Sequence, residues 1–324
     1  MKAQRLHQTA PLETKPLRYE DVPVPKPGPG EVLIKVLYCG VCLTDKHIIE
    51  NELPPHKLPL IPGHQVVGFI EDEGRHVGAY WLYSSCSVCD YCKKGFENLC
   101  EQATFTGFDR DGGYAEYMVA RRDFLVDLDP DMVSEKMAPL LCAGIVGYRS
   151  YKLSGIRPGE TLALVGFGTS AHLIIQLARY HRCTVYVFTR GEHHRRLARE
   201  LGADFVGPLD APPPRLVESV ILFAPVGELI ATSLKMLKRG GKLAVNAIHM
   251  SDLSHLAYED LYYEKSVTSV SHVTRADARE FIDLARTASI TPRTELFPLK
   301  RANDALIKQK ESRHLGAIVL AMEG

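Results

Sequence analysis

The chain has 324 residues, 45% of them hydrophobic and 24% charged, and its 39 basic side chains balance 39 acidic ones. This composition is typical of a globular protein of about two domains of ~150 residues each. A neutral chain lacks the basic surface of nucleic-acid binders, so we expect no nucleic-acid partner. With no run of ~20 apolar residues and no apolar N-terminal stretch, we expect a cytoplasmic protein without a membrane partner, whose thiols stay reduced.

Residues 1–144 favour β-structure. The apolar runs EVLIKVLYC at 31–39 and QVVGFI at 65–70 predict strands, and PVPKPGPG at 23–30 predicts a loop. Four cysteines then fall within fifteen residues: Cys86, Cys89, Cys92 and Cys100. The spacing C-x2-C-x2-C-x7-C suits four thiolates around one structural zinc ion, with two lysines inside the loop to offset their charge. Unmetallated buried thiols, two disulfides and an iron–sulfur cluster are the alternatives, the last disfavoured by the long final gap.

From residue 145 the pattern changes to alternating strands and helices. The predicted strands are TLALV at 161–165, CTVYVF at 183–188, SVILFA at 219–224, KLAVNAI at 242–248 and SVTSVSHV at 266–273. The predicted helices are HLIIQLARYH at 172–181, HHRRLARELG at 193–202, GELIATSLKMLKRGG at 227–241 and TRADAREFIDLAR at 274–286. This alternation predicts an α/β fold with a doubly wound parallel sheet. HLGAIVLAM at 314–322 predicts a strand that returns to the first part of the chain.

The segment GFGTSA follows the first of these strands and opens a helix. It places Gly166, Gly168 and Ala171 in the dinucleotide fingerprint G-x-G-x-x-G/A, whose glycines let the backbone approach a pyrophosphate. The second strand ends at Thr189 and Arg190, where NAD-binding sites usually carry an acid. An arginine there suits a 2′-phosphate, so we expect NADP rather than NAD. The alternative is that this arginine and its neighbours form only a solvated helix face.

Three further ligand types are spread along the chain, in Cys42, His64 and Cys142. Taken singly, each reads equally well as a core or surface residue. Their segments, however, run in a familiar order: C-G-V-C-x-T-D-x-H, P-G-H, the four-cysteine lobe, L-L-C-A-G and the glycine turn. Over essentially its whole length the chain resembles the zinc-dependent alcohol dehydrogenases of the medium-chain dehydrogenase/reductase superfamily.

This resemblance implies a domain plan and an assembly. It implies a GroES-like, β-rich catalytic domain at 1–144 that carries the zinc lobe at 86–100. A Rossmann NAD(P)-binding domain is implied at 145–271, and a C-terminal segment, 272–324, returns to the catalytic domain. It also implies a homo-oligomer, either a dimer or a tetramer.

The resemblance further implies two Zn2+ ions per chain. Cys42, His64 and Cys142 would hold the catalytic ion, which leaves one coordination position for an alcohol or aldehyde substrate, and the lobe would hold the structural ion. Thr44 and His47 match the family's proton relay, and Asp45 matches the carboxylate that orients the ligating histidine. Without the resemblance, Thr44 and Asp45 could equally be helix caps and His47 a surface residue.

Several positions depart from the family pattern or bear on its substrate. Gln65 replaces the usual Glu after the ligating histidine, Leu43 replaces a polar residue, and Ala317 stands where many relatives have Arg. Trp81 resembles a residue that lines the family's substrate cleft. We expect a zinc-dependent oxidoreductase that moves a hydride between an alcohol and NAD(P)+. The alternatives are a polyol or formaldehyde-type enzyme of the same superfamily and a non-catalytic zinc and nucleotide sensor.

Overall fold

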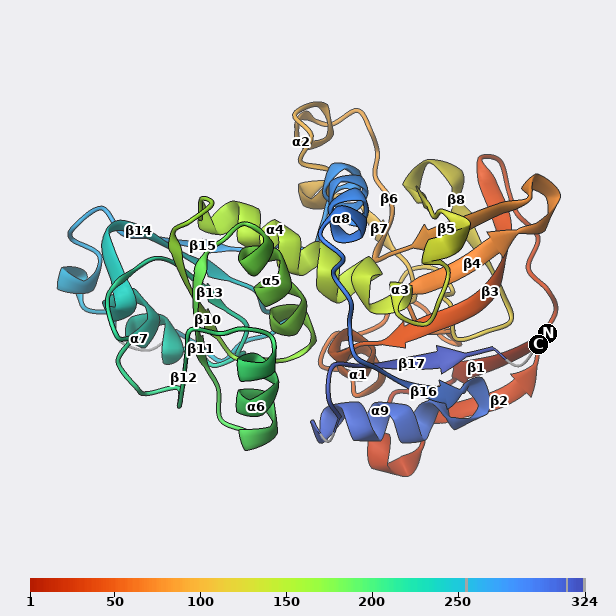
Figure 1. Ribbon diagram of the computed structural model, residues 1–324. Coiled ribbons are helices and arrows are strands. Elements are labelled where there is room, and N and C mark those ends of the chain that lie inside the picture. Colours follow the sequence, from red (N-terminus) through yellow and green to blue (C-terminus); the bar gives the residue numbers. More distant parts are fainter. Residues whose placement is uncertain (254–255, 313, 323–324) are drawn as a thin grey trace. The chain divides into compact units, whose positions relative to one another are not determined.

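The computed structural model describes residues 1–253, 256–312 and 314–322, so residues 313, 323 and 324 of the expected C-terminal segment lie outside it. The chain divides into two units (Figure 1). Unit 1 contains Met1–Cys142, Val273–Ile282 and the chain from Pro292 onward, and unit 2 contains Ala143–His272 and Asp283–Thr291. Each unit has its own buried apolar core.

Unit 1 is built around one long strand, β3 (Glu31–Val41), in which buried and more exposed residues alternate over the first half. The sheet runs in the order β16-β17-β3-β4-β5-β9, and β8 also pairs with β3. Its other members are β4 (Val66–Ile70), β5 (Arg75–Ala79), β8 (Tyr117–Arg121), β9 (Val126–Asp127), β16 (Thr294–Pro298) and β17 (Ala317–Ala321). Two short pairs complete the strands: β1 (Lys2–Leu6) with β2 (Leu17–Asp21), and β6 (Leu82–Ser84) with β7 (Thr104–Phe105). Because β17 pairs antiparallel with β3 from Ile318↔Val41 to Ala321↔Tyr38, the end of the chain supports the strand that leads to Cys42.

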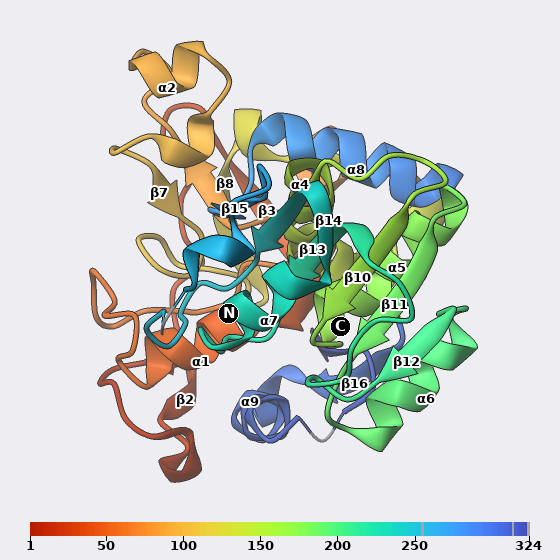
Figure 2. The same ribbon diagram turned by 90° about the vertical axis from the view of Figure 1, so that its left-hand side faces the viewer.

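The helices of unit 1 are short. They are α1 (Leu43–Ile49), α2 (Asp90–Lys93), α3 (Met137–Pro139) and α9 (Ala302–Lys310), with single turns at η1 (Leu12–Thr14), η2 (Glu71–Glu73), η3 (Glu97–Leu99), η4 (Arg122–Phe124), η5 (Pro130–Met132) and η8 (Leu299–Arg301). A π-helical turn, η6, covers Leu140–Gly144. In both views α9 lies beside β16, and it also packs against α1 (Figures 1 and 2). The connection after β4 is short, because η2 and Gly74 (φ +63°) join β4 to β5 in a tight hairpin.

Unit 2 holds a six-stranded, wholly parallel sheet in the order β12-β11-β10-β13-β14-β15 (Figure 2). The strands are β10 (Thr161–Val165), β11 (Thr184–Phe188), β12 (Phe205–Gly207), β13 (Val217–Leu222), β14 (Leu237–Val245) and β15 (Ser266–Ser269). Numbered within the sheet, this is the order 3-2-1-4-5-6 of the Rossmann fold, which confirms the predicted doubly wound sheet. The order reverses between β10 and β13, and this switch point is where such sheets bind their ligands.

The connections of unit 2 are α5 (Thr169–Tyr180), α6 (Glu192–Glu200) and α7 (Leu229–Met236), preceded by α4 (Ile145–Ser154) and followed by η7 (Tyr258–Asp260). Helix α8 (Arg275–Thr287) begins in unit 1 and ends in unit 2. Right-handed crossovers on opposite sides of the switch point put α5 and α6 on one face of the sheet and α7 on the other. Within the described residues, no helix has both the length and the apolar character needed to cross a bilayer.

The helix predicted over 227–241 is wrong at its C-terminal end. Helix α7 ends at Met236, and Leu237 already pairs with Val217 of the neighbouring strand. The register then shifts before Lys242 meets Ser219, and Gly240 adopts a φ of +73° inside this irregularity. The glycines that look like a helix stop therefore belong to a bulge at the start of β14.

Candidate active site and zinc lobe

Cys42, His64 and Cys142 come together in unit 1, although 100 residues of sequence separate the first from the last. One ligand atom from each lies within 4.8 Å of the other two. His64 is 1% exposed, and both cysteines are partly buried. Two sulfurs and one imidazole nitrogen in a single cluster form the donor set of a catalytic zinc site with an open coordination position.

Cys42 is fixed by the start of helix α1. Its backbone N–H donates to Asp45 Oδ2 at 2.9 Å, and the N–H of Asp45 donates back to the Cys42 carbonyl at 3.2 Å. The Asp45 amide also faces the Cys42 side chain, which together with the Asp45 carboxylate on the Cys42 amide makes a capping box that satisfies amide groups a helix start otherwise leaves free. The thiol therefore projects from the junction of β3 and α1 in a defined direction.

His64 is placed by glycine backbones that pack without side chains between them. Gly63 has a φ of +96°, and a Cβ there would lie 2.3 Å from the Tyr114 ring. A Cβ on Gly112 would lie 2.0 Å from the Gly63 carbonyl oxygen. The amides of Gly113 and Tyr114 donate to Gly63 and Pro62 at 2.9 and 3.0 Å. This close pairing holds the segment before His64 in place, and only glycine allows it.

Cys142 lies in the π-helical turn at Leu140–Gly144. The preceding residue, Leu141, is fully buried and packs over β5, where a Cβ on Gly78 would approach its side chain to 2.5 Å. Such π turns are rare in proteins and are often found at functional sites. Here the turn and the glycine below it bring the thiol to the other two ligands.

Asp45 connects the cluster to its surroundings. It is fully buried, its Oδ1 lies 3.2 Å from His64 Nδ1, and its Oδ2 accepts a hydrogen bond from the Tyr114 hydroxyl at 3.0 Å. The contact through Nδ1 turns the other ring nitrogen, Nε2, away from the carboxylate. In the described part of the chain neither ring nitrogen has a hydrogen-bond partner, and Nε2, unlike Nδ1, has no carboxylate contact either. A buried ring nitrogen that has no protein partner and lies beside two sulfurs is suited to bind a metal ion.

The electrostatics of the cluster favour a cation. Burial alone would lower the pKa of the His64 imidazole, but the Asp45 carboxylate and the Cys42 thiolate raise it to about 10. The contact with Cys142 lowers the pKa of Cys42 well below its usual value, and the same contact raises that of Cys142. The surroundings thus favour one ionised thiol and one positive charge beside it. A bound zinc ion would supply that positive charge.

Thr44 and His47 lie three residues apart, on one face of α1. The hydroxyl oxygen of Thr44 is 3.5 Å from Cys42 Sγ, and the residue is 9% exposed. It is the second residue of the helix, whose cap is Cys42, so the alternative of a helix cap does not describe it. The His47 side chain is only 16% exposed, and its Nδ1 pairs with the Glu52 carboxylate.

The four cysteines of the lobe also converge. Their sulfurs lie within 4.8 Å of one another, and Cys86 Sγ is 3.9 Å from Cys92 Sγ. A tetrahedron with ~2.3 Å zinc–sulfur bonds separates its sulfurs by about 3.8 Å, whereas a disulfide joins them at ~2.05 Å. All eight cysteines of the chain are free, so the two-disulfide alternative does not describe this structure.

Within the lobe, backbone amides lower the pKa of one cysteine thiol, whereas burial raises the pKa of another. The backbone amides of Val88 and Cys89 lower the pKa of Cys86 to about 6, and the Cys89 amide lies 3.3 Å from its sulfur. Burial raises the pKa of Cys100 to about 11, and the neighbouring sulfurs of Cys86 and Cys92 add to this rise. Four sulfurs at this spacing repel one another as thiolates, and a divalent cation between them removes the penalty.

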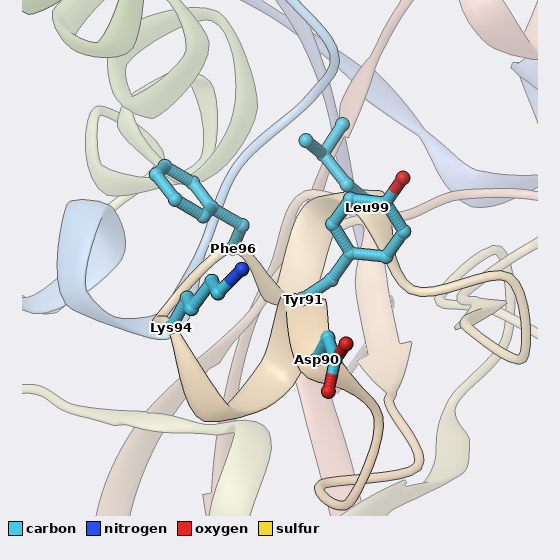
Figure 3. A pocket seen from close by; sticks show the side chains of 5 residues that line it. All are labelled: Asp90, Tyr91, Lys94, Phe96 and Leu99. Atoms are coloured by element: carbon cyan, nitrogen blue, oxygen red, sulfur yellow. The ribbon is translucent and has the colours of Figure 1, made fainter.

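The lobe stands away from the sheet of unit 1 in both views (Figures 1 and 2). An ion pair between Glu97 and the Arg275 side chain connects it to α8, and the Arg275 amide also donates to Glu97 at 3.1 Å. The surface of the lobe carries an open hollow of about 460 Å³, in which Tyr91 and Leu99 face Phe96 and Lys94 (Figure 3). None of the residues that line it belongs to the Cys42–His64–Cys142 cluster, so we do not assign the hollow to a substrate.

The predicted dinucleotide turn in unit 2 lies between β10 and α5, at the switch point of the sheet. Gly166 has a φ of +89°, and a Cβ there would lie 2.7 Å from the Ala224 amide, just beyond β13. At Gly168, which caps α5, a Cβ would meet no atom of the described residues within 4 Å. Ala171 is fully buried in α5, where a small side chain suits close helix packing. The open cradle at the N-terminus of α5 fits a pyrophosphate.

Thr189 and Arg190 directly follow β11. Thr189 is buried, its amide donates to the Gly207 carbonyl at 3.0 Å, and Arg190 is exposed. The next acid, Glu192, is held by ion pairs with two arginines of its own helix, at 2.8 and 3.1 Å. At the end of β11, the described residues therefore offer an exposed arginine but no carboxylate that is free of an ion pair.

Two residues of this site were missed in the sequence. Tyr114 supports both Asp45 and Gly63, but GGYAEY carries no pattern that indicates such a contact. Glu52 lies in a polar stretch after α1, and nothing in its spacing indicates that it folds back onto His47. Trp81 lies against the site, because its ring meets the His64 ring edge-on with centroids 5.0 Å apart.

Comparison with known proteins agrees with this geometry. Residues 28–130 match the family described as Alcohol dehydrogenase GroES-like domain. The chain is 42% identical to a probable alcohol dehydrogenase of Mycobacterium tuberculosis, over 99% of this chain and 97% of that protein. Acetophenone reductase from Geotrichum candidum, solved in complex with NAD, has a TM-score of 0.86 at 26% identity, with 99% of this chain and 96% of that chain covered.

A thermostable alcohol dehydrogenase from Pyrobaculum aerophilum, solved with cobalt and zinc bound, also has a TM-score of 0.86 at 26% identity, with 99% of both chains covered. These likenesses extend over both units and confirm the expected GroES-like and Rossmann architecture. The chain therefore belongs to the zinc-dependent alcohol dehydrogenases of the medium-chain dehydrogenase/reductase superfamily and is an alcohol or aldehyde oxidoreductase.

Proposed function

We propose that the enzyme transfers a hydride between a small alcohol and NAD(P)+ with catalytic zinc on Cys42, His64 and Cys142. The observation that supports this most is the convergence of the three ligand atoms within 4.8 Å, with the buried Nε2 of His64 lacking a hydrogen-bond partner among the described residues. A second, structural zinc ion is proposed on the four cysteines of the lobe. Its support is the convergence of the four sulfurs within 4.8 Å of one another, with one pair 3.9 Å apart.

The protein's own residues have separate tasks in this reaction. Bound zinc would lower the pKa of the alcohol as a Lewis acid, and the nicotinamide would exchange the hydride with the substrate carbon. Asp45 orients His64 through Nδ1 and so presents Nε2 to the metal site. The Thr44 hydroxyl, beside Cys42, takes the alcohol proton, and His47 passes it on towards water.

Metal analysis together with kinetics tests the zinc assignment. We expect about two zinc ions per chain in the wild type and about one in His64→Ala and Cys42→Ala, since each removes a ligand of one site only. Both variants should lose at least about 10³-fold in kcat/KM for alcohol oxidation. Activity that survives both substitutions, with the fold intact by circular dichroism, would refute the mechanism.

We propose NADP as the preferred coenzyme, held by the cradle at Gly166, Gly168 and Ala171. The support is Arg190 at the end of β11, where an acid would select the ribose hydroxyl of NAD. The NAD complex of the Geotrichum relative argues for measuring both coenzymes. We expect a higher kcat/KM with NADPH, which Arg190→Ala should lower about tenfold while kcat/KM with NADH stays unchanged. A strong preference of the wild type for NADH would contradict this.

The proposed substrates are small alcohols and aldehydes with an apolar group. The support is the wall that Trp81 forms beside His64, where it stacks on Phe105 at 5.1 Å. A panel of primary alcohols, aldehydes, polyols and formaldehyde distinguishes this from the polyol or formaldehyde-type alternative. Coenzyme binding without turnover of any of these compounds would instead indicate a sensor.

We further propose that residues 1–144 form the catalytic domain, that 145–271 bind the coenzyme, and that 272–324 complete the catalytic domain. The pairing of β17 with β3 supports the last assignment. A dimer or tetramer is proposed for the assembly, to be tested by light scattering. The eight free cysteines support a cytoplasmic location, because the cytoplasm keeps thiols reduced.

A further inference from the structure

The imidazole of His47 is held by a carboxylate that no sequence motif assigns. Its Nδ1 pairs with Glu52 Oε2, while the other oxygen of Glu52 pairs with the Lys46 ammonium group. The side chains of His47 and Lys46 are 16% and 13% exposed, and that of Glu52 is 36% exposed. Only the His47 and Lys46 ends of the contact are therefore shielded from water, where a charged pair has more effect than at an open surface.

The backbone after α1 brings Glu52 to this place. The helix ends at Ile49, and Asn51 adopts a left-handed φ of +65°, which Asn tolerates better than most residues. The amide of Leu53 then donates to the His47 carbonyl at 2.9 Å. This bond closes the turn beside His47, so the backbone conformation of the turn fixes the position of Glu52.

A carboxylate on Nδ1 has two effects on an imidazole. An ionised carboxylate can only accept, so it holds the ring proton on Nδ1 and leaves Nε2 as the nitrogen that takes a further proton. Once Nε2 is protonated, the same carboxylate stabilises the positive ring. Burial by itself raises the pKa of Glu52, but its bonds to Lys46 and His47 lower it to about 2, so this carboxylate is ionised at every working pH.

Glu52 also belongs to a wider cluster of charges that joins α1 to α9. Glu50 accepts from Lys46 at 3.2 Å and from Lys310 of α9 at 2.7 Å, and Lys310 also donates to Glu13 at 2.8 Å. The cluster contains three carboxylates and two ammonium groups, from Glu13, Glu50, Glu52, Lys46 and Lys310.

We propose that Glu52 is a positioning residue for proton transfer, which fixes the Nδ1–H tautomer of His47 and stabilises the ring while it carries the substrate proton. The inference rests on the proposed role of His47 in the relay. In alcohol oxidation Nε2 takes the proton and later releases it to water, and Glu52 stays ionised throughout. A purely structural role at the end of α1 would affect stability but neither the tautomer nor the pH profile.

The first test reads the tautomer directly, without activity. Zinc-loaded protein labelled with 15N at histidine should show the His47 ring proton on Nδ1 in long-range 1H–15N spectra. Glu52→Leu should remove this preference, whereas Glu50→Gln, which changes the same helix end but does not touch His47, should keep it. A wild-type ring with its proton on Nε2, or an unchanged spectrum in Glu52→Leu, would overturn the proposal.

The second test uses kinetics at constant zinc content. Glu52→Gln keeps the shape and an acceptor oxygen but loses the charge, so kcat for alcohol oxidation should fall about tenfold and its acidic limb should move down by about one pH unit. Glu50→Gln should keep the wild-type profile. If His47→Ala leaves kcat unchanged, the relay itself is wrong. If His47→Ala lowers kcat but Glu52→Gln does not, only the role of Glu52 is wrong.

Discussion

Asp45 shows how much one buried side chain does at the residue scale. Its two oxygens serve the His64 ring, the Cys42 amide and the Tyr114 hydroxyl, so it supports two of the three proposed metal ligands at once. Burial and the nearby Asp45 carboxylate raise the pKa of Tyr114 well above its usual value, and its hydroxyl therefore remains a donor. Asp45 is accordingly both part of a helix cap and the support of His64, a proposed metal ligand.

We therefore expect Asp45→Asn to weaken zinc binding about 10–100-fold while the fold persists, because the amide is nearly isosteric but cannot match the charge behind His64. Competition with a chelator, with circular dichroism as the check on folding, measures this. Tyr114→Phe removes only one of the three contacts and should have a smaller effect. Equal zinc affinity in Asp45→Asn and the wild type would show that the carboxylate does not support the site.

At the scale of elements, a network of charges joins α1 to α9 and to η1. Glu50 is 11% exposed, accepts from the Leu12 amide at 3.0 Å, and pairs with Lys310 and Lys46. Burial alone would raise the pKa of Glu50, but these donors lower it below its usual value. A carboxylate with a lowered pKa in the folded state stabilises the protein above its unfolded-state pKa of ~4.3, and this contribution disappears as the pH falls through the folded-state value.

The corresponding prediction concerns the difference in Tm between the wild type and Glu50→Gln. We expect the wild type to be more stable by a constant amount above about pH 5 and the difference to shrink below about pH 4, where Glu50 takes up a proton. Thermal unfolding followed by circular dichroism from pH 7 to 3 measures this. Asp131→Asn, at an exposed position, should follow the wild type throughout. A difference that grows with acidification would contradict the sign of the linkage.

Five of the six described strands of unit 2 could be predicted from the sequence, because short apolar runs with polar boundaries define buried parallel strands, whereas the three-residue strand β12 was missed. The end of α7 could not, since LKMLKRGG suits a helix with a glycine stop as well as it suits a bulged strand. Pairing of Leu237 with Val217 decides between them, and that contact is not local. The motifs similarly point to Cys42 and His64, whereas Glu52 depends on one left-handed residue, Asn51, that no periodicity reveals.

At the scale of the whole molecule, an ion pair connects the four-cysteine lobe to the rest of the fold. Its buried Glu97 pairs with Arg275 at the start of α8, the helix that enters unit 2. The zinc ion proposed on the four sulfurs would hold the backbone that positions Glu97. Loss of that ion should therefore loosen the N-terminal end of α8 as well as the lobe.

We expect Cys92→Ser to lose about one zinc ion per chain and to lower Tm by roughly 5–10 °C, while the ion at the three-ligand site stays bound. Zinc analysis and calorimetry on the same sample measure both effects. Glu97→Gln is the matched control, because it should keep both ions and lower Tm less. An unchanged metal count in Cys92→Ser would refute the zinc assignment of the lobe.

The position of β17 beside β3 has a consequence for how the protein is made. The strand that leads into Cys42 gains this neighbour only after residues 317–321 have left the ribosome. Until then the nascent chain carries its thiols on an incomplete sheet. We therefore expect the proposed metal site at Cys42 to become stable only once β17 has paired with β3, so a translation product that ends before residue 317 would bind the ion weakly.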